Sequence, residues 1–394
     1  MARSASELQS TSRATTATLL PLMAVVLIAF LMIGLAIPVL PLHVHQNLGL
    51  GTSCVGLVTG TQFCASLVSR LWAGRFADDQ GSKRTMTVGL MAAVAAGLLY
   101  LLSLELTATP LVSVTILLLG RAVLGAAESF ILTGAVTWGL SRAGQGSAGK
   151  VIAWMGTSMF AAFVVGAPLG TALYARSGFG GIALATTLVP LATLLLIVPL
   201  RPVAPVHASG PKFWSVLREI WVPGVGAALS AVGFGTISTF SSLLFVERHW
   251  SPIWLPFTAY AGGLIAARLA FGDIPDRIGG AKAALFSVIV EAAGLALIYF
   301  AQSATMANFG AALSGLGYAL VFPGFGVEVA RRAGARGRGV AMGAYTACPD
   351  FALGVSGPAL GLIAASLGLS VVFLISSATV LCAVVVAAWL LYAR

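Results

Sequence analysis

RLWAGRFADDQGSKR, residues 70–84, ends an apolar run of the chain and turns at Gly81 into a Lys–Arg pair. RLAFGDIPDRIGGAK, residues 268–282, has the same arrangement 198 positions further along the chain. The matching positions are Arg70, Leu71, Gly74 and Asp78 in the first copy and Arg268, Leu269, Gly272 and Asp276 in the second. A motif that recurs at about half the length of a long apolar chain indicates two duplicated halves, the architecture of many secondary transporters.

The composition is that of a membrane protein. Of the 394 residues, 58% are hydrophobic and 9% are charged, whereas a soluble domain carries about 25% charged residues. Apolar runs of about 20 residues, the length of helix that crosses the hydrocarbon core of a bilayer, recur from end to end. The sequence therefore predicts an all-α integral membrane protein and excludes a soluble globular domain.

The net charge of +10 does not predict a nucleic-acid partner. Most Lys and Arg residues fall in the N-terminal tail, the C-terminal end and every second loop, and this alternation is the positive-inside pattern of membrane proteins. We therefore expect a multi-pass protein of the cell (inner) membrane with both termini in the cytoplasm. We expect it to contact membrane lipids and to be a monomer.

Twelve membrane spans are expected, and a Pro-rich segment at 201–212 separates them into two sets of six. The spans cover about residues 18–45, 53–77, 85–105, 111–140, 151–175 and a segment ending near 200, then 219–247, 252–275, 283–302, 305–330, 339–366 and 370–392. The predicted domains are a cytoplasmic tail at 1–17, a six-helix bundle at 18–200, a cytoplasmic loop at 201–218 and a second six-helix bundle at 219–394.

No segment has the pattern of a cofactor or metal site. The four cysteines lie in apolar segments, without disulfide or zinc spacing. Residues 144–150, GQGSAGK, satisfy most of a phosphate-binding loop, but Val151 replaces the Ser or Thr that would hold magnesium and no strand precedes the segment. We therefore expect no cofactor and no metal, and an energy source in an ion gradient or in the gradient of the substrate itself.

The repeated motif has the features of a gate between two helical bundles. Arg70, Gly74 and Asp78 form one stripe of a helix. Gly74 would let a neighbouring helix approach closely, and Asp78 would accept from a helix N-terminus or an Arg of the facing bundle. Lys83 and Arg84 are expected at anionic lipid headgroups. The predicted gate residues are Gly74, Arg75, Asp78, Gly81, Lys83 and Arg84, with Gly272, Asp276 and Arg277 in the second copy.

These residues resemble the cytoplasmic loop signature of the major facilitator superfamily, roughly G-x-x-x-D-R-x-G-R-R/K. Gly74, Asp78, Gly81 and the terminal basic pair fit the signature, whereas Asp79 and Ser82 depart from it. Two further stretches agree with this family. Residues 121–128, RAVLGAAE, resemble its fourth-helix motif. Residues 166–170, GAPLG, resemble the fifth-helix motif of proton-driven exporters and are echoed at 357–361.

The resemblance extends over essentially the whole chain and is closest to the twelve-span drug:proton antiporter group, in a bacterial branch of sugar-efflux-like exporters. It implies two pseudo-symmetric six-helix bundles that alternate access to a central cavity. It also implies a helix-five antiporter motif made of Gly166, Pro168 and Gly170.

Charged residues inside apolar spans cost several kcal/mol in hydrocarbon, so each is expected to face the protein interior or a wet cavity. They are Arg70, Arg121, Glu128, Arg268, Glu291 and Asp350. Arg70 and Arg268 are interpreted as cavity-facing or helix-pairing residues, with Arg121 in the same charge network. Glu291 is interpreted as structural.

Glu128 and Asp350 are the candidates for proton coupling. The residues three and four positions from Glu128 are apolar or lack a side chain, so burial should favour its protonated form. A structural carboxyl bonded to a neighbouring helix is the alternative. Asp350 lies next to Pro349, and structural and coupling roles are both open for it.

The function predicted on these grounds is secondary active transport, by proton-coupled efflux (antiport) of small amphipathic organic molecules or drugs. Gln62 and Phe234 are expected to line the substrate cavity. The alternative is a proton-coupled importer or facilitator of a small solute such as a sugar or metabolite. No enzyme is expected, because His43 and His45 form the one candidate catalytic cluster and no carboxylate lies near them in the sequence.

Overall fold

The computed structural model describes residues 5–143, 148–200, 202, 213–332 and 334–392. The predicted loop at 201–218 and the GQGSAGK segment lie largely outside these ranges. The first half consists of α1 (Ala5–Ala36), α2 (Leu40–Leu42), the π-helix η1 (His43–Asn47), α3 (Thr52–Gln80), α4 (Ser82–Glu105), α5 (Pro110–Ala143) and α6 (Ala148–Ile197). The second half consists of α7 (Phe213–Glu247), α8 (Leu255–Phe271), α9 (Ile274–Ile278), α10 (Gly280–Tyr299), α11 (Ala304–Arg332), α12 (Gly334–Leu367) and α13 (Leu369–Tyr392).

Twelve membrane crossings follow from the described helices. Ten are long and apolar enough to span a bilayer, and α8 is a shorter apolar helix. The 50-residue α6 contains two of the predicted spans, because Gly178 breaks it with a φ of 60° that favours glycine. The predicted fold class, an all-α membrane protein with two six-helix bundles, is confirmed.

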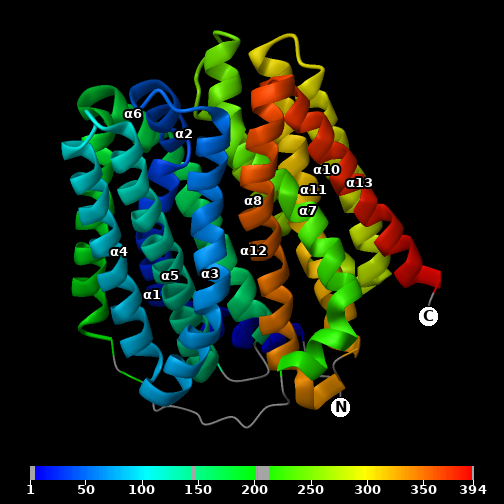
Figure 1. The fold of residues 1–394 in the computed structure, drawn as a ribbon. Coiled ribbons are helices and arrows are strands. Elements are labelled where there is room, and N and C mark those ends of the chain that lie inside the picture. The colour runs from blue at the N-terminus through cyan, green and yellow to red at the C-terminus, as the bar shows by residue number, and fades with distance from the viewer. Residues whose placement is uncertain (1–4, 144–147, 201, 203–212, 333, 393–394) are drawn as a thin grey trace.

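The two halves of the chain stand side by side, the first from blue to green and the second from green to red (Figure 1). Within the first half α1 packs against α6 and α4 against α5, and within the second half α10 packs against α11 and α13. The halves meet where α3 packs against α12 and α6 against α8. The polar residues that matter for function lie on or beside these four helices.

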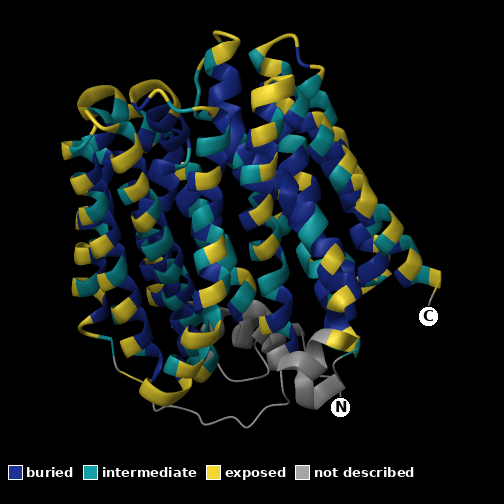
Figure 2. Ribbon diagram, viewed as in Figure 1, coloured by how far each residue is buried: buried dark blue, intermediate teal, exposed yellow. Residues whose placement is uncertain are grey.

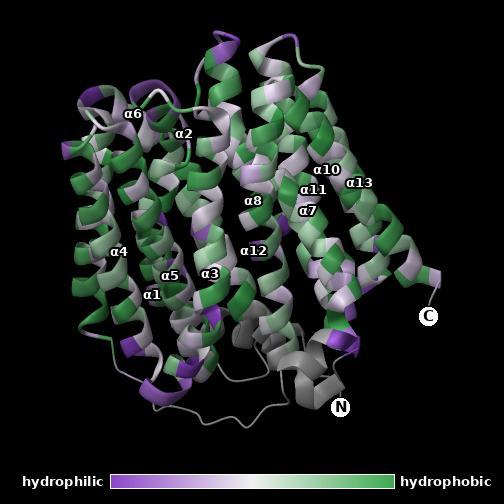
Figure 3. Cartoon of the chain, in the orientation of Figure 1, coloured by the Kyte–Doolittle hydropathy of each residue, from purple (hydrophilic) through white to green (hydrophobic). Residues whose placement is uncertain are grey.

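The outside of the protein suits a bilayer. Large side chains such as Leu195 and Val385 are 74% and 70% exposed. Exposed positions lie on the outer helix faces (Figure 2), and those faces are mostly hydrophobic (Figure 3). Lipid tails cover such surfaces without cost, and the helices satisfy their own backbone groups.

One difference from the expected span edges concerns the N-terminus. The helix α1 already begins at Ala5, so it extends through most of the segment that the sequence assigns to a tail at 1–17. The exact division into tail, bundles and loop stays a prediction.

Candidate functional site

A polar cluster lies where α3 meets α5 and α12. Gln62, Ser66 and Arg70 repeat every four residues along α3, which places them on one helix face. Gln62 Nε2 donates to Glu128 Oε2 on α5 at 2.7 Å. Ser66 Oγ donates to Asp350 Oδ2 on α12 at 3.3 Å. One stripe of α3 therefore contacts both predicted coupling carboxyls.

Arg70 and Asp350 form an ion pair between the two bundles. Arg70 also donates from Nη1 to Thr346 Oγ1 on α12 at 3.4 Å. The side chains of the pair keep 20% and 14% of their surface exposed, so the pair is not sealed inside the protein. Of the two interpretations of Arg70, this structure shows helix pairing, and its partner belongs to the other half of the chain.

Glu128 has a partner that its own helix does not supply. The amide of Gln62 donates to its carboxyl from α3, which matches the alternative of a carboxyl bonded to a neighbouring helix. The role of Glu128 in proton coupling stays a prediction. Asp350, Arg70 and Arg121 lie within electrostatic range of Glu128, so two carboxyls and two guanidinium groups influence one another here.

Arg121 lies inside the first bundle, with 4% of its surface exposed. Its Nε donates to the Val58 carbonyl on α3 at 3.3 Å. Its Nη1 donates to the Tyr100 hydroxyl on α4 at 3.4 Å. Arg121 thus ties three helices together and makes no direct bond to Glu128.

Aromatic side chains from both bundles meet beside the polar cluster. Phe234 on α7 is at the centre, with ring centroids 5.8 to 6.4 Å from six others. These are Phe63, Phe160, Phe163, Phe257, Tyr260 and Tyr318. Phe234 is only 7% exposed, so its ring forms part of an apolar wall that joins the two halves.

Arg268, the second-copy counterpart of Arg70, points at this wall. Its guanidinium carbon is 5.3 Å from the centroid of the Phe160 ring on α6. A Cβ at Gly156, one turn earlier on α6, would lie 3.1 Å from its Nη1. Within the described ranges Arg268 makes no hydrogen bond and no ion pair.

The bundles are in close contact at the end opposite the duplicated motif. A Cβ at Gly56 of α3 would collide with the Gly357 carbonyl of α12, and Thr52 Oγ1 donates to the Gly361 carbonyl at 2.9 Å. The echoed GPALG segment is therefore a close-packing face between bundles. The GAPLG segment does the same within the first bundle, where Gly166 and Gly170 of α6 contact Gly34 and Leu35 of α1.

The duplicated motif lies at the end where these contacts stop. A Cβ at Gly74 would meet no atom within 4 Å, and one at Gly272 would meet only the Arg268 carbonyl of its own turn. Among the described residues, the expected close approach of a helix at Gly74 is therefore absent from this conformation. Arg75, Asp78, Asp276 and Arg277 are exposed.

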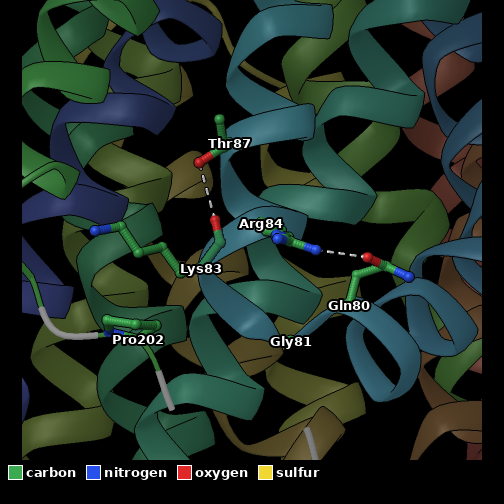
Figure 4. A pocket seen from close by; sticks show the side chains of 6 residues that line it. All are labelled: Gln80, Gly81, Lys83, Arg84, Thr87 and Pro202. Atoms are coloured by element: carbon green, nitrogen blue, oxygen red, sulfur yellow. Dashed lines mark hydrogen bonds between the residues drawn. The ribbon is translucent and has the colours of Figure 1, made fainter. Parts of the chain in front are cut away.

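Lys83 and Arg84 have local partners at this end. Lys83 Nζ donates to the Val198 and Leu200 carbonyls, both at 2.8 Å, and so satisfies backbone groups where α6 ends. Arg84 donates to Gln80 at 2.8 Å. Both line a pocket of about 360 Å³ with Gly81, Thr87 and Pro202 (Figure 4). The expectation that Lys83 serves as a lipid anchor did not foresee this capping role.

His43 and His45, in the π-helix η1, do not form a joint site. His43 is buried and stacks on Phe179, with ring centroids 4.1 Å apart. His45 is exposed and bonds the Leu50 carbonyl through Nδ1 at 2.9 Å. Glu291 is fully buried and accepts a hydrogen bond from Ser230.

The family of the chain follows from its sequence. The sequence model described as Major Facilitator Superfamily matches residues 22–354 and 225–394. The chain belongs to the Major Facilitator Superfamily. Because relatives that match 88% to 94% of the chain are described as MFS-type transporters, this MFS chain is a membrane transporter.

Three such relatives come from different bacteria. An uncharacterised MFS-type transporter of Salmonella typhimurium (strain LT2) is 41% identical over 94% of this chain and 96% of its own length. One from Pseudomonas aeruginosa PAO1 is 38% identical over 88% of this chain and 86% of its own. One from Burkholderia pseudomallei (strain 1106a) is 38% identical over 92% of this chain and 89% of its own length.

Solved structures share the fold of this MFS transporter. The nucleoside transporter NupG is similar with a TM-score of 0.73 and 14% identity, covering 95% of this chain and 99% of that one. The human organic anion transporter MFSD10 is similar with a TM-score of 0.71 and 16% identity, again covering 95% of this chain and 99% of that one. At these identities the likeness concerns the fold alone.

Two polar residues with partners on neighbouring helices of the MFS transporter, Ser66 and Glu328, were not foreseen from sequence. Ser66 could have been found, because it lies midway between Gln62 and Arg70 on the same helix stripe. Glu328 on α11 is 1% exposed and accepts from the Ala281 amide, at the start of α10, at 3.3 Å. It satisfies a helix N-terminus, and no local pattern indicates that partner.

Proposed function

We propose that the transporter exports small amphipathic organic molecules in exchange for protons, by alternating access between its two bundles. The observation that carries the proposal is the Arg70–Asp350 ion pair between the bundles, with Glu128 within electrostatic range of both residues. A proton on Asp350 removes the charge that holds Arg70, and a proton on Glu128 changes the field around both. Proton binding would therefore change the strength of a contact between bundles, which is what a coupling site requires.

The proposed orientation places the duplicated motif, both termini and the inter-bundle loop in the cytoplasm, in the inner membrane of the cell. The close contacts at Gly56 and Thr52 then lie on the outside, and the structure represents a conformation closed outward. The gate residues of the two motif copies, Asp78 and Asp276 among them, would engage the facing bundle in the opposite conformation. The free surface around Gly74 supports this assignment, because space for a closing helix is present there.

Substrate uptake into inverted membrane vesicles tests the proposal. With an imposed pH gradient, acid inside, vesicles that contain the transporter should accumulate members of a panel of amphipathic organic compounds above control vesicles. Dissipating the gradient should abolish the accumulation. Accumulation that occurs only in right-side-out vesicles would favour the importer of a small solute, and uptake that never exceeds equilibrium would favour a facilitator.

A further inference from the structure

Arg268 is a cation in the interface that has an aromatic ring, and no carboxylate, as its contact among the described residues. Its guanidinium reaches from α8 across to α6, where it lies beside Gly156 and over the Phe160 ring. In the part of the chain that the structure describes it has neither a hydrogen bond nor an ion pair. Taking such a group out of water is costly unless its donors find acceptors.

The internal duplication indicates which kind of partner Arg268 lacks among the described residues. Arg70 and Arg268 are the same position of the two motif copies. Arg70 is paired with Asp350, which lies seven residues before Gly357 of the GPALG segment. Arg268 faces Phe160, which lies six residues before Gly166 of the GAPLG segment. The second copy thus keeps the cation and has an aromatic ring at nearly the position of the carboxylate.

Two hydroxyl donors beside Arg268 also have no acceptor. Tyr260 Oη is buried without a hydrogen-bond partner, and none of the hydrogen bonds among the described residues involves the Tyr318 hydroxyl. Both tyrosines pack against Phe234, whose ring also contacts Phe160 beneath the Arg268 guanidinium. Two carboxyls lie within electrostatic range of Tyr318, Glu291 and Asp350. Glu291 is fully buried and accepts from Ser230 on α7, and Asp350 is paired with Arg70.

The surroundings of these donors are apolar. Phe160 lies beneath Arg268, and the Phe234 ring lies 5.8 Å from Tyr260 and 6.2 Å from Phe160 between ring centroids. A cation with hydroxyl donors binds a carboxylate or another oxyanion well, and an aromatic wall binds a ring or an alkyl chain. The arrangement fits a molecule that has both parts.

We propose that Arg268, with the hydroxyls of Tyr260 and Tyr318, binds the anionic group of the substrate, and that the substrates are amphipathic organic acids whose apolar part lies on the Phe160–Phe234 wall. This inference rests on the proposed transport function and specifies its substrate class. Asp350 already neutralises the charge of Arg70. Of the two repeated arginines, Arg268 in the second bundle is therefore the one available to bind a substrate anion.

Ligand binding to the purified transporter in detergent tests this directly. The probes are aryl carboxylates of increasing size, from benzoate through 2-naphthoate to 4-phenylbenzoate, each paired with its neutral primary amide. The Kd is taken from the ligand-dependent rise in Tm. We expect the larger carboxylates to bind about tenfold more tightly than their amides, as one charge-assisted contact implies. If no carboxylate binds more tightly than its amide, the proposal fails.

Variants locate the contact. Arg268→Gln should remove the preference for carboxylates, whereas Arg176→Gln, which changes an exposed arginine on α6, should keep it. If Arg268→Gln does not fold, two substitutions of Phe160 test the same assignment. Phe160→Asp supplies an internal counter-ion and should weaken carboxylate binding about tenfold more than the uncharged Phe160→Asn. Equal effects of Asp and Asn, or a preference that survives Arg268→Gln, would overturn the assignment.

Binding in detergent needs no gradient, so the outcome is independent of proton coupling. A carboxylate preference without proton-driven transport would leave this inference standing and remove the antiport mechanism. Proton-driven transport of neutral or cationic compounds, without a carboxylate preference, would do the reverse.

Discussion

Arg70 on α3 and Asp350 on α12 form an ion pair that connects the two bundles beside Glu128. The pair belongs to neither bundle alone, so any movement that separates α3 from α12 at this level must break it. The protonation state of its carboxyl and the relative position of the bundles are therefore linked. This linkage is the physical basis of the proposed antiport.

The first prediction concerns this pair. Arg70→Gln and Asp350→Asn should each slow proton-driven transport by about tenfold or more, because each leaves the other group without its partner. In the double variant the loss should be much smaller than the product of the two single losses, with a coupling energy of about 1 kcal/mol or more. Transport rates in vesicles measure the losses of the single variants and the coupling energy.

Ser66→Ala is the control, since it removes a single hydrogen bond at 3.3 Å. Independent, multiplicative losses would show that the pair does not act as a unit.

The second prediction concerns the closed end. Gly56→Ala places a methyl group against the Gly357 carbonyl and should force the bundles apart there. A cysteine at Thr239, which is buried on α7 and bonds Thr59 of α3 at 3.2 Å, should then react faster with a polar maleimide. Gly262→Ala is the matched control, because a Cβ there meets no atom within 4 Å. A labelling rate that is the same in both variants would argue against a closed contact at Gly56.

The third prediction concerns Lys83. Lys83→Met removes both hydrogen bonds to the end of α6 and should destabilise the protein by about 0.3–1 kcal/mol, a fall in Tm of about 1–2 °C. The loss should be the same in zwitterionic and in anionic detergent–lipid mixtures. Arg84→Met, which loses a contact to Gln80 alone, should change the Tm less. A Tm loss that appears only with anionic lipid would instead identify Lys83 as a lipid anchor.

The fourth prediction concerns orientation. On a background without the four native cysteines, single cysteines at the exposed positions Gln80 and Asp276 should be labelled from the cytoplasmic side. Cysteines at the exposed positions Gly51 and Gln302 should be labelled from outside. Labelling of Gln80 and Gly51 from the same side would contradict the proposed topology.

The fold could be predicted from sequence because its determinants are local. Apolar runs of membrane length indicate the spans, and the repeat of residues 70–84 at 268–282 indicates two halves. The pairing of Arg70 with Asp350 could not be predicted in this way, since the residues are 280 positions apart and meet only through the packing of α3 on α12. Gln62 and Glu128, 66 positions apart, were missed as partners for the same reason.

The glycines also show that sequence alone does not predict which helices are in contact. Gly74 and Gly357 both lie in motifs that favour close helix packing, yet among the described residues a helix packs against Gly357 and none against Gly74. Sequence identifies the positions where bundles can approach, and the conformation decides which of them are in contact. Lys83 and Glu328 satisfy the ends of helices that are distant in sequence, and such partners depend on tertiary structure.

The central claim is that a proton on the Glu128–Asp350 group drives transport, and Glu128→Gln tests it most directly. The variant resembles the permanently protonated residue and keeps an oxygen that can accept from Gln62. In proteoliposomes, with a substrate identified in the vesicle screen, it should lose accumulation driven by a pH gradient while retaining substrate-for-substrate exchange, because exchange needs no net proton movement. If Glu128→Gln concentrates substrate against its gradient at the wild-type rate, Glu128 does not carry the proton. If Asp350→Asn does so as well, the antiport account is wrong.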